Sequence, residues 1–402
     1  LFQDVLIELT KERVTLKNRF LFDDLSDCVM RVWAACEETI LYEEMITDIQ
    51  TPCGGLRSIE IAMDAAPANV REYTINVEII NQNPDSFVHF VREIAREQLI
   101  LENENYHDSK ADIKAEPLTV VEGDVNIGVI DGNTRYLFSL CEGGPVSLCV
   151  NGREHIYRAP KLSFWRALTD NDLGGKSGYD RAGWMTAGLF AKVERIEKSI
   201  ESRNPFVRYH FLLPGITDGK AVISYEFDDR NLLKVTAEFT GTKELYEMPL
   251  FAVDFMLKGD YHRFRYYGKG PMECQNDREE GAFLGVYEST ARENVTRNLR
   301  PQECGNRTGV RYVKVYNEKG QGLMFIADKT PFEMSVLPYS AYELENAWHQ
   351  EELADSKYTW VRICACQRGV GGDDSWGAPI GELYELDSSK PVKLEFFVKE
   401  LD

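Results

Sequence analysis

The sequence lacks the features of a membrane protein, a secreted precursor or a nucleic-acid-binding protein. No apolar run approaches the roughly 18 residues of a membrane-spanning helix, and residues 1–20 are too charged for a signal peptide. Lys and Arg number only 46 against 66 Asp and Glu, so the formal net charge is −20. Such a charge repels phosphate backbones and anionic lipid surfaces. We therefore expect neither nucleic acid nor a membrane as a partner.

Cysteine and histidine are too scattered to indicate a disulfide framework or a metal site. The nine cysteines are odd in number and widely spaced. We interpret them as small apolar fillers in a reducing compartment, and expect a cytoplasmic protein. Cys364 and Cys366 share one face of an expected strand, but no third soft ligand stands near them, and the six histidines show no ligand spacing. No metal site is expected in this chain.

The spacing of apolar residues predicts a mostly antiparallel all-β protein. Short segments rich in β-branched and aromatic residues recur between turns that contain Gly, Asn or Asp. No strand pattern is regularly followed by a helix of ten or more residues, so a parallel α/β barrel is not expected. The expected strands are 5–8, 73–80, 207–213, 233–239, 310–316, 323–327, 358–364 and 392–398.

The 402 residues suit two domains better than one. A polar stretch at 103–118 is the best candidate for the boundary, and it leaves about 110 residues before it and about 285 after it. Two stretches, 28–49 and 86–103, fit a helix or strands equally well. The sequence begins with Leu1 instead of Met, which favours a piece of a longer polypeptide.

The most informative segment is GVGGDDSWG at 369–377, one large aromatic among glycines and short acids. Glycine admits the positive φ values of a compact bend, so Trp376 is expected on a tight turn. A flat exposed ring suits the C–H faces of a sugar, and Asp373 and Asp374 can accept hydrogen bonds from hydroxyls. Carbohydrate is therefore the first ligand class to test. Alternatively, Trp376 closes the end of a hairpin onto a core.

A second segment, FWRALTDNDLGG at 164–175, concentrates aromatic, cationic and acidic side chains before two glycines. Asp170 or Asp172 could accept a bidentate pair from Arg166 and so order a loop that bears on a ligand. The alternative is a buried Arg–Asp turn that only holds structure. The polar, glycine-rich residues that follow are a candidate gate.

Two further segments, YYGKGPMECQNDREEGAFLGVYE at 266–288 and RPQECGNRTGVRY at 300–312, are rich in carboxylates. Retaining glycoside hydrolysis needs two carboxyl groups about 5 Å apart, which proximity in sequence does not establish. No nucleophile elbow, zinc motif or dinucleotide fingerprint occurs. From its residues alone we expect a two-domain β protein with a candidate sugar platform and no complete catalytic constellation.

The order and spacing of these four segments resemble the C-terminal part of the family 2 glycoside hydrolases, specifically of β-galactosidases. Residues 14–22 resemble the start of the immunoglobulin-like domain that follows the catalytic barrel in that family, so the resemblance covers essentially the whole chain. It implies an immunoglobulin-like β-sandwich at 1–113, followed at 116–402 by a large antiparallel two-sheet β-sandwich, a mutarotase-like supersandwich. It also implies that 90–101 are extended.

The resemblance implies a part of an enzyme that hydrolyses terminal non-reducing β-D-galactose residues with retention. In that family the acid/base, the nucleophile and the magnesium ligands lie on the barrel, which this chain does not contain. No catalytic residue and no metal ligand is therefore expected here, the isolated chain is expected to be inactive, and magnesium is implied only for the full enzyme. The expected partners are a β-galactoside, the catalytic barrel and, at full length, further copies of the enzyme.

The resemblance also assigns roles to single residues. Trp376 matches a tryptophan that the terminal domain contributes to the sugar pocket, and Asp373 and Asp374 are expected to shape the turn under it. Gly174 matches the glycine that opens a mobile loop, so 174–180 would be the gate. Four residues are expected to support this gate: Arg166, Asp170, Asn171 and Asp172.

Departures from the family and two other functions stay open. The family usually has proline at Leu168 and an aromatic residue at Met272, which leaves the preference for galactosides over a related sugar open. A carbohydrate-binding or interaction module needs only a sandwich with one exposed tryptophan. A mutarotase-type epimerase would need His and Glu side chains converging on a sugar ring. The large domain offers His155, His210, His262 and His349, none of them inside the four segments.

Overall fold

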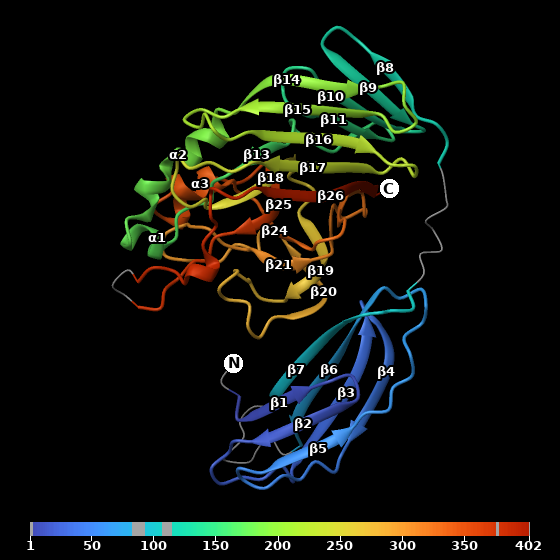
Figure 1. Cartoon of the computed structure of the whole chain (residues 1–402), viewed down its shortest axis with the longest axis vertical. Coiled ribbons are helices and arrows are strands. Elements are labelled where there is room, and N and C mark those ends of the chain that lie inside the picture. Colours follow the sequence, from blue (N-terminus) through green and yellow to red (C-terminus); the bar gives the residue numbers. More distant parts are fainter. Residues whose placement is uncertain (1–2, 83–92, 107–114, 375–377, 402) are drawn as a thin grey trace. The chain divides into compact units, whose positions relative to one another are not determined.

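The computed structural model describes residues 3–82, 93–106, 115–374 and 378–401 (Figure 1). The chain divides into two compact units: unit 1 comprises Leu1–Asp112 with Phe283–Val286, and unit 2 comprises Ile113–Ala282 with Tyr287–Asp402. The domain bounds inferred from the sequence, 1–113 and 116–402, stay a prediction, since the segment where they meet lies largely outside the described residues.

Unit 1 is built from two antiparallel sheets whose buried side chains form one cluster. Val14 and Leu16 of one sheet and Val32, Ile75 and Val77 of the other belong to it. The first sheet has the order β1 (Val5–Leu9), β2 (Arg13–Asn18), β5 (Leu56–Glu60). The second has the order β4 (Thr39–Ile46), β3 (Cys28–Cys36), β6 (Glu72–Asn81), β7 (Glu93–Glu102).

The other three sheets formed by the described residues belong to unit 2, except that Phe283–Val286 at the start of the last strand belong to unit 1. The first has the order β12 (Arg153–Glu154), β11 (Pro145–Val150), β10 (Thr134–Ser139), β9 (Asn126–Asp131), β8 (Thr119–Glu122). The second has the order β13 (Lys161–Ser163), β18 (Leu250–Lys258), β25 (Tyr358–Gln367), β24 (Phe332–Leu337), β21 (Arg307–Val310). The third has the order β14 (Lys192–Ser199), β15 (Phe206–Leu212), β16 (Ala221–Phe227), β17 (Leu233–Phe239), β26 (Val392–Leu401), β23 (Gly322–Ala327), β22 (Tyr312–Tyr316), β19 (Arg263–Gly270), β20 (Phe283–Thr290).

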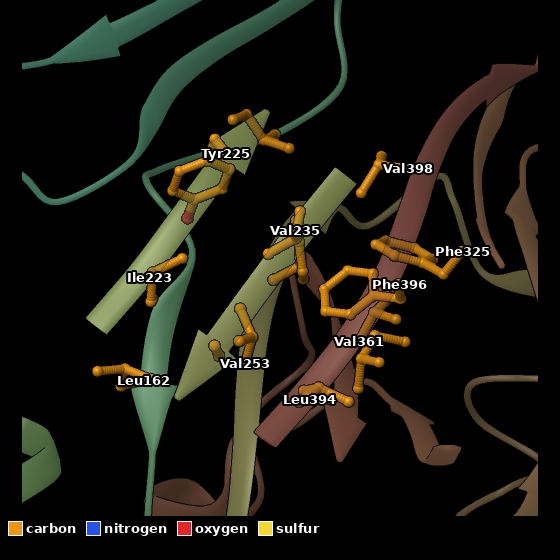
Figure 2. Close-up of a cluster of buried hydrophobic side chains, with 14 of the residues drawn as sticks. Leu162, Ile223, Tyr225, Val235, Val253, Phe325, Val361, Leu394, Phe396 and Val398 are labelled. Atoms are coloured by element: carbon orange, nitrogen blue, oxygen red, sulfur yellow. The ribbon is translucent and has the colours of Figure 1, made fainter. Parts of the chain in front are cut away.

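The second and third sheets of unit 2 enclose its main core. Alternate residues of their strands point inward, since successive side chains of a strand face opposite sides of the sheet. Phe255 of β18 contacts Phe325 of β23 and Phe396 of β26, with ring centroids 4.9 and 6.0 Å apart. Figure 2 shows Phe325 and Phe396 with the aliphatic residues of both sheets, Val361 among them.

The all-β class inferred from the sequence is confirmed. The ambiguous stretch 28–49 forms the hairpin of β3 and β4. Most positions of β3 are buried, so its sequence does not alternate clearly and imitates a buried helix. Of the second ambiguous stretch, Glu93–Glu102 is strand β7, and residues 83–92 lie outside the described residues.

In the described part of unit 2 there are three α-helices: α1 (Asp170–Gly174), α2 (Ser177–Leu189) and α3 (Ala341–Asn346). In addition there are two single 3₁₀ turns, η1 (Gln350–Glu352) and η2 (Glu382–Tyr384). Within the part of the chain that the structure describes, no helix is long and apolar enough to cross a membrane. Figure 1 shows α1, α2 and α3 at the same end of unit 2. That end also carries the segments of the candidate site.

Replacement of Phe396 by Ala should destabilise unit 2 strongly. Phe396 is fully buried, whereas Phe397 is next to it on β26 and faces the other side of the sheet. Phe396→Ala leaves a cavity between two sheets and should lower the free energy of unfolding by about 3–5 kcal/mol. Phe397→Ala, the matched control, should cost roughly 1 kcal/mol. Urea denaturation of both variants tests this; equal losses would contradict the two-sheet core.

Candidate functional site

The segment Phe164–Asp172 leaves strand β13 and turns into helix α1. Thr169 is the N-cap residue: its hydroxyl accepts a hydrogen bond from the Asp172 N–H at 3.2 Å, and an Asp172 carboxylate oxygen accepts from the Thr169 N–H at 3.1 Å. This reciprocal capping box satisfies two backbone donors that a helix start otherwise leaves open. The sequence TDND therefore fixes Asp172 on a buried turn.

Asp172 lies between two arginines. Arg166 Nη2 is 3.1 Å from Asp172 Oδ2, and Arg368 Nη1 is 3.0 Å from Asp172 Oδ1. All three side chains are buried. Burial alone would raise the pKa of the Asp172 carboxyl, but Arg166, the hydrogen bonds from Thr169 and Arg368 together hold that pKa below its usual value. Of the two candidate acceptors of Arg166, Asp172 forms the ion pair.

The same turn holds the backbone that follows strand β25. Arg166 Nη1 donates to the Arg368 carbonyl at 2.8 Å, and Arg166 Nη2 donates to the Gly369 carbonyl at 3.0 Å. Asn171 Nδ2 donates to the Val370 carbonyl at 3.0 Å. Three consecutive carbonyls are thereby tied to residues about two hundred positions earlier in the sequence. The backbone of 368–370, which leads to the segment with Trp376, is therefore held by Arg166 and by Asn171 of the TDND turn (169–172).

The opposite side of this loop base is held by the segment after strand β19. The Gly371 N–H donates to Asp277 Oδ2 at 2.7 Å, and Arg278 Nη2 donates to the Gly371 carbonyl. Gly372 has φ +96°, and a Cβ there would lie 2.6 Å from Arg278 Nη2. The left-handed backbone favours glycine at this position, and a larger residue would also have to displace the end of the Arg278 side chain.

Of the residues expected to shape the sugar platform, Asp373 and Asp374 are described and exposed. Asp374 Oδ1 accepts a hydrogen bond from the Ala378 N–H at 3.0 Å, and so joins the two flanks of the loop. Asp373 is exposed beside it. Trp376 lies outside the described residues, and its role in sugar binding stays a prediction.

A cavity of about 200 Å³ lies between the loop and helix α2. By volume it could hold about six water molecules, or one small polar ligand. Its walls carry both signs of charge, with carboxylates of Asp172, Asp180, Glu247 and Glu385 and the guanidinium groups of Arg181 and Arg368. Arg181 is also paired with Glu247. Donors and acceptors in a confined space suit a ligand rich in hydroxyl groups.

The expectation that 174–180 form a loop is wrong for the backbone. Gly174 ends helix α1, and Ser177 already begins helix α2, so only Gly175 and Lys176 separate the helices. The glycines of α2 allow close packing: a Cβ at Gly178 would lie 2.3 Å from Leu168 Cδ1, and one at Gly183 would lie 2.7 Å from Leu245 Cδ2. The sequence pattern of 174–179 instead indicates a flexible, polar segment. The gating role itself stays a prediction.

Asp170 does not pair with Arg166. It is exposed, and its contacts go to Gln302: the Asp170 N–H donates to Gln302 Oε1 at 3.1 Å, and Gln302 Nε2 donates to Asp170 Oδ2 at 2.9 Å. Leu168 N–H donates to Glu345 Oε2 at 2.6 Å, a bond that proline at this position could not make. Met272, at the other departure from the family, is 75% exposed.

Sequence reasoning did not single out Gln302 and Glu345. Gln302 lies inside the segment 300–312, so the sequence offered a reason to consider it a site residue. Glu345 lies on α3, in a stretch that contains no motif. Both contribute side chains to the TDND turn from a distance of more than 130 residues in sequence.

Two carboxylates near the site, Glu303 and Glu333, are held by neighbouring side chains and backbone N–H groups. Glu303 is buried, pairs with Arg362 Nη1 at 2.9 Å and accepts from the Ala167 N–H at 3.2 Å. Burial raises the pKa of Glu303 against the opposing effect of Arg362. Glu333 accepts from Asn306 Nδ2 at 2.8 Å and from the Gln367 N–H at 3.2 Å. Burial raises the pKa of Glu333 to about 7.

The histidines of unit 2 have separate surroundings. His155 is buried and stacks on Tyr261 with ring centroids 5.3 Å apart. Each of the other three lies beside a different carboxylate: His210 by Glu197, His262 by Glu318 and His349 by Glu352. These contacts do not suggest the converging His and Glu pair of a mutarotase-type epimerase. Among the described residues, moreover, no three His, Cys, Asp or Glu side chains gather closely enough to hold a metal ion.

Fold and site together define an all-β protein in which the buried ion pairs of Asp172 with Arg166 and Arg368 hold the backbone that follows strand β25. Residues 131–398, more than half of the 402, match the family model described as the β-galactosidase small chain. The chain belongs to this family.

Two relatives show the extent of the match. A β-galactosidase from Streptococcus thermophilus is 34% identical over 404 residues, which cover 100% of this chain and 39% of that protein. The β-galactosidase small subunit of Latilactobacillus sakei is 32% identical over 309 residues, which cover 69% of this chain and 96% of that protein. The chain spans only 27% to 40% of the length of four β-galactosidases that it matches.

Among solved structures, a galactose mutarotase-like protein from Lactobacillus casei superposes on 71% of this chain and 100% of its own. The TM-score is 0.35 and the sequence identity is 11%. At this score the likeness carries no argument about the site.

Replacement of Asp172 by Asn should disturb the site much more than the same change at Asp170. Asp172→Asn leaves two buried arginines without their shared carboxylate, so the free energy of unfolding should fall by about 3–5 kcal/mol. Asp170→Asn, the matched control in an exposed position, should cost under about 1 kcal/mol. Urea denaturation at pH 7 measures both. Similar losses for the two variants would show that Asp172 does not hold the site.

Glu333 should make the stability of unit 2 depend on pH. Its pKa rises from 4.5 to about 7 on folding, so the folded state keeps a proton that the unfolded chain releases within this window. Ionisation therefore destabilises the fold as pH rises from about 4.5 to 7, by roughly 3 kcal/mol. Arg166 opposes this effect and Glu279 adds to it.

Glu333→Gln removes this titration. The free energy of unfolding of the variant, minus that of the wild type, should therefore rise between pH 4.5 and 8, as followed by urea denaturation. A constant difference for Glu333→Gln across this pH range would contradict the raised pKa.

Proposed function

We propose that this chain is the component of a β-galactosidase that lacks the catalytic barrel. Together with a barrel-bearing polypeptide it would serve the hydrolysis of terminal non-reducing β-D-galactose residues in galactosides, with retention. The observation that carries the proposal is the match of 131–398 to the family described as the β-galactosidase small chain. In addition, the match to a relative named as a small subunit covers 96% of that relative.

In this proposal the chain completes the sugar pocket with Trp376. The support comes from the loop base, where Arg166, Asn171 and Asp277 hold the backbone of 368–371. A tryptophan mounted on a fixed base loses little further conformational entropy when it binds a sugar. Asp373 and Asp374 are exposed and shortly precede Trp376 in the sequence, and their carboxylates can accept hydrogen bonds from sugar hydroxyls.

The gate of the proposed pocket is the junction of α1 and α2. Gly174 has no atom within 4 Å of the position its Cβ would take, and Lys176 has φ +57° in the left-handed region. A residue with a side chain occupies this region at a cost, which a movement of the junction would release. The first residues of α2 would then shift beside the cavity.

The catalytic carboxylates and the magnesium ion of the complete enzyme belong, in this proposal, to the barrel. Glu303 and Glu333 are engaged in buried contacts, and the described residues offer no metal-ligating cluster, so no catalytic or metal-dependent step is assigned to this chain. We further propose that the complete enzyme is a cytoplasmic homo-oligomer.

A second candidate function is that of a carbohydrate-binding module. The polar cavity of about 200 Å³ favours it, because all its walls belong to unit 2. Such a module would bind a sugar without a partner and would catalyse nothing.

The chain alone should not hydrolyse a chromogenic galactoside. Mixed with a polypeptide that supplies the barrel of a β-galactosidase, and with magnesium present, it should restore hydrolysis, because the acid/base and the nucleophile would then be supplied. The measurement is the rate of release of the chromophore with each component alone and with both. Activity of this chain alone would place catalytic acids here, with Glu273 and Glu303 the first to replace.

In the assembled enzyme, Trp376→Ala should raise KM by about tenfold and change kcat little, since it removes a binding platform and no reacting group. Trp376→Phe, which keeps a flat ring, should restore most of the affinity. Kinetics with a galactoside that has a large leaving group measures this. Unchanged KM in Trp376→Ala would sink the proposed role, and sugar binding by the isolated chain would favour the module instead.

A further inference from the structure

Two large apolar side chains of unit 2 are exposed beside the TDND turn. Leu299 is 98% exposed and Trp348 is 65% exposed. They come from different segments, 298–300 and the turn after helix α3, which the structure joins directly. Gln350 Nε2 donates to the Asn298 carbonyl at 2.8 Å, and the Arg300 guanidinium lies over the Trp348 ring, 4.4 Å from its centroid. We call Leu299, Arg300 and Trp348 the LRW surface.

Two of the three residues of the LRW surface, Arg300 and Trp348, are held by neighbouring groups. The Trp348 N–H donates to Glu352 Oε2 at 2.9 Å, and Arg300 Nη2 donates to the Glu345 carbonyl at 3.4 Å. The stacked guanidinium restricts the rotamers of Trp348. Side chains that are already ordered before they are covered lose little entropy on binding, which favours association.

The same two segments hold the candidate site. Arg300 is two residues from Gln302, whose side chain bonds Asp170, and Trp348 is three residues from Glu345, whose carboxylate accepts from the Leu168 N–H. The LRW surface and the TDND turn are therefore parts of one hydrogen-bonded unit. Anything that covers this surface would also bear on α1 and on the loop that Arg166 and Asn171 support.

We infer that the LRW surface is a docking site for the barrel-bearing part of the β-galactosidase; this inference rests on the proposed function. In the four β-galactosidases compared above, about three fifths or more of the protein lies outside the region that matches this chain. In the complete enzyme, we expect that additional polypeptide to cover part of the surface of this chain. Trp and Arg are the residues that most often dominate binding energy at interfaces. An interface here would be linked, through Gln302 and Glu345, to the turn that supports residues 368–371.

Two variants test the docking site. Leu299→Asp places a charge in the centre of the proposed interface, and Trp348→Ala removes its aromatic anchor. Each should weaken binding to a barrel-supplying β-galactosidase polypeptide about tenfold or more. Val125→Asp, the matched control, changes an apolar residue that is 64% exposed at the turn between β8 and β9 and should bind like the wild type. Biolayer interferometry gives the dissociation constants.

A second readout separates docking from damage to the site. At saturating concentrations of the partner, Leu299→Asp and Trp348→Ala should restore galactoside hydrolysis to nearly the wild-type rate, because the catalytic groups and Trp376 are unchanged. Unfolding midpoints within a few degrees of the wild type would verify that the variants fold.

The outcomes distinguish the two proposals. If the wild-type chain does not bind or complement the partner, the proposed function fails. If the wild type binds and both variants bind equally well, only the docking site is wrong. If analytical ultracentrifugation shows that the chain alone self-associates and that Leu299→Asp abolishes this, the surface is covered by a second copy, and the inference is overturned.

Discussion

The candidate site depends on the shared ion pair of Asp172 with Arg166 and Arg368. Two cations and one carboxylate, all buried, come from segments about two hundred residues apart. Each buried charge is costly without its partners, so the three side chains form the arrangement together or not at all. Arg166 also donates hydrogen bonds to the carbonyls of Arg368 and Gly369. The same side chain therefore forms the ion pair and holds the backbone at the base of the loop.

Around this ion pair the neighbouring segments are tied together by side chain to backbone bonds. Gln302 and Glu345 hold the outer side of the TDND turn, and Asp277 holds the loop base from the other side. An exposed loop with few apolar contacts is normally the least stable part of a domain. Here its flanks acquire stability from the core of unit 2, to which β13 and β25 both belong. The described base of the loop, residues 368–371, is thus held in place beside the exposed Asp373 and Asp374.

The fold class and several residues around the site could be predicted from the sequence. Which of these residues form ion pairs and hydrogen bonds with one another could not. Within unit 2, alternating patterns predicted six strands, β15, β17, β22, β23, β25 and β26, because half-buried strands show period two, and the glycines around Trp376 indicated a turn. The choice of Asp172 over Asp170 depended on the capping box, which places one carboxylate inward and the other outward. The start of helix α2 was missed because Gly178, which permits contact with Leu168, looks like flexibility in a sequence. Glu345 had no local signal at all.

Strand β26 gives the nine-stranded sheet an unusual folding requirement. It is the last of the strands in sequence but the fifth of nine in the sheet, where it pairs with β17 on one side and β23 on the other. Until it is inserted, two blocks of four strands expose hydrophobic faces and two open edges that invite pairing with other chains. Completion of the sheet thus waits for contacts of long sequence separation, which fold slowly. During synthesis this chain should therefore depend on chaperones or dilution to avoid aggregation, however stable the finished sheet is.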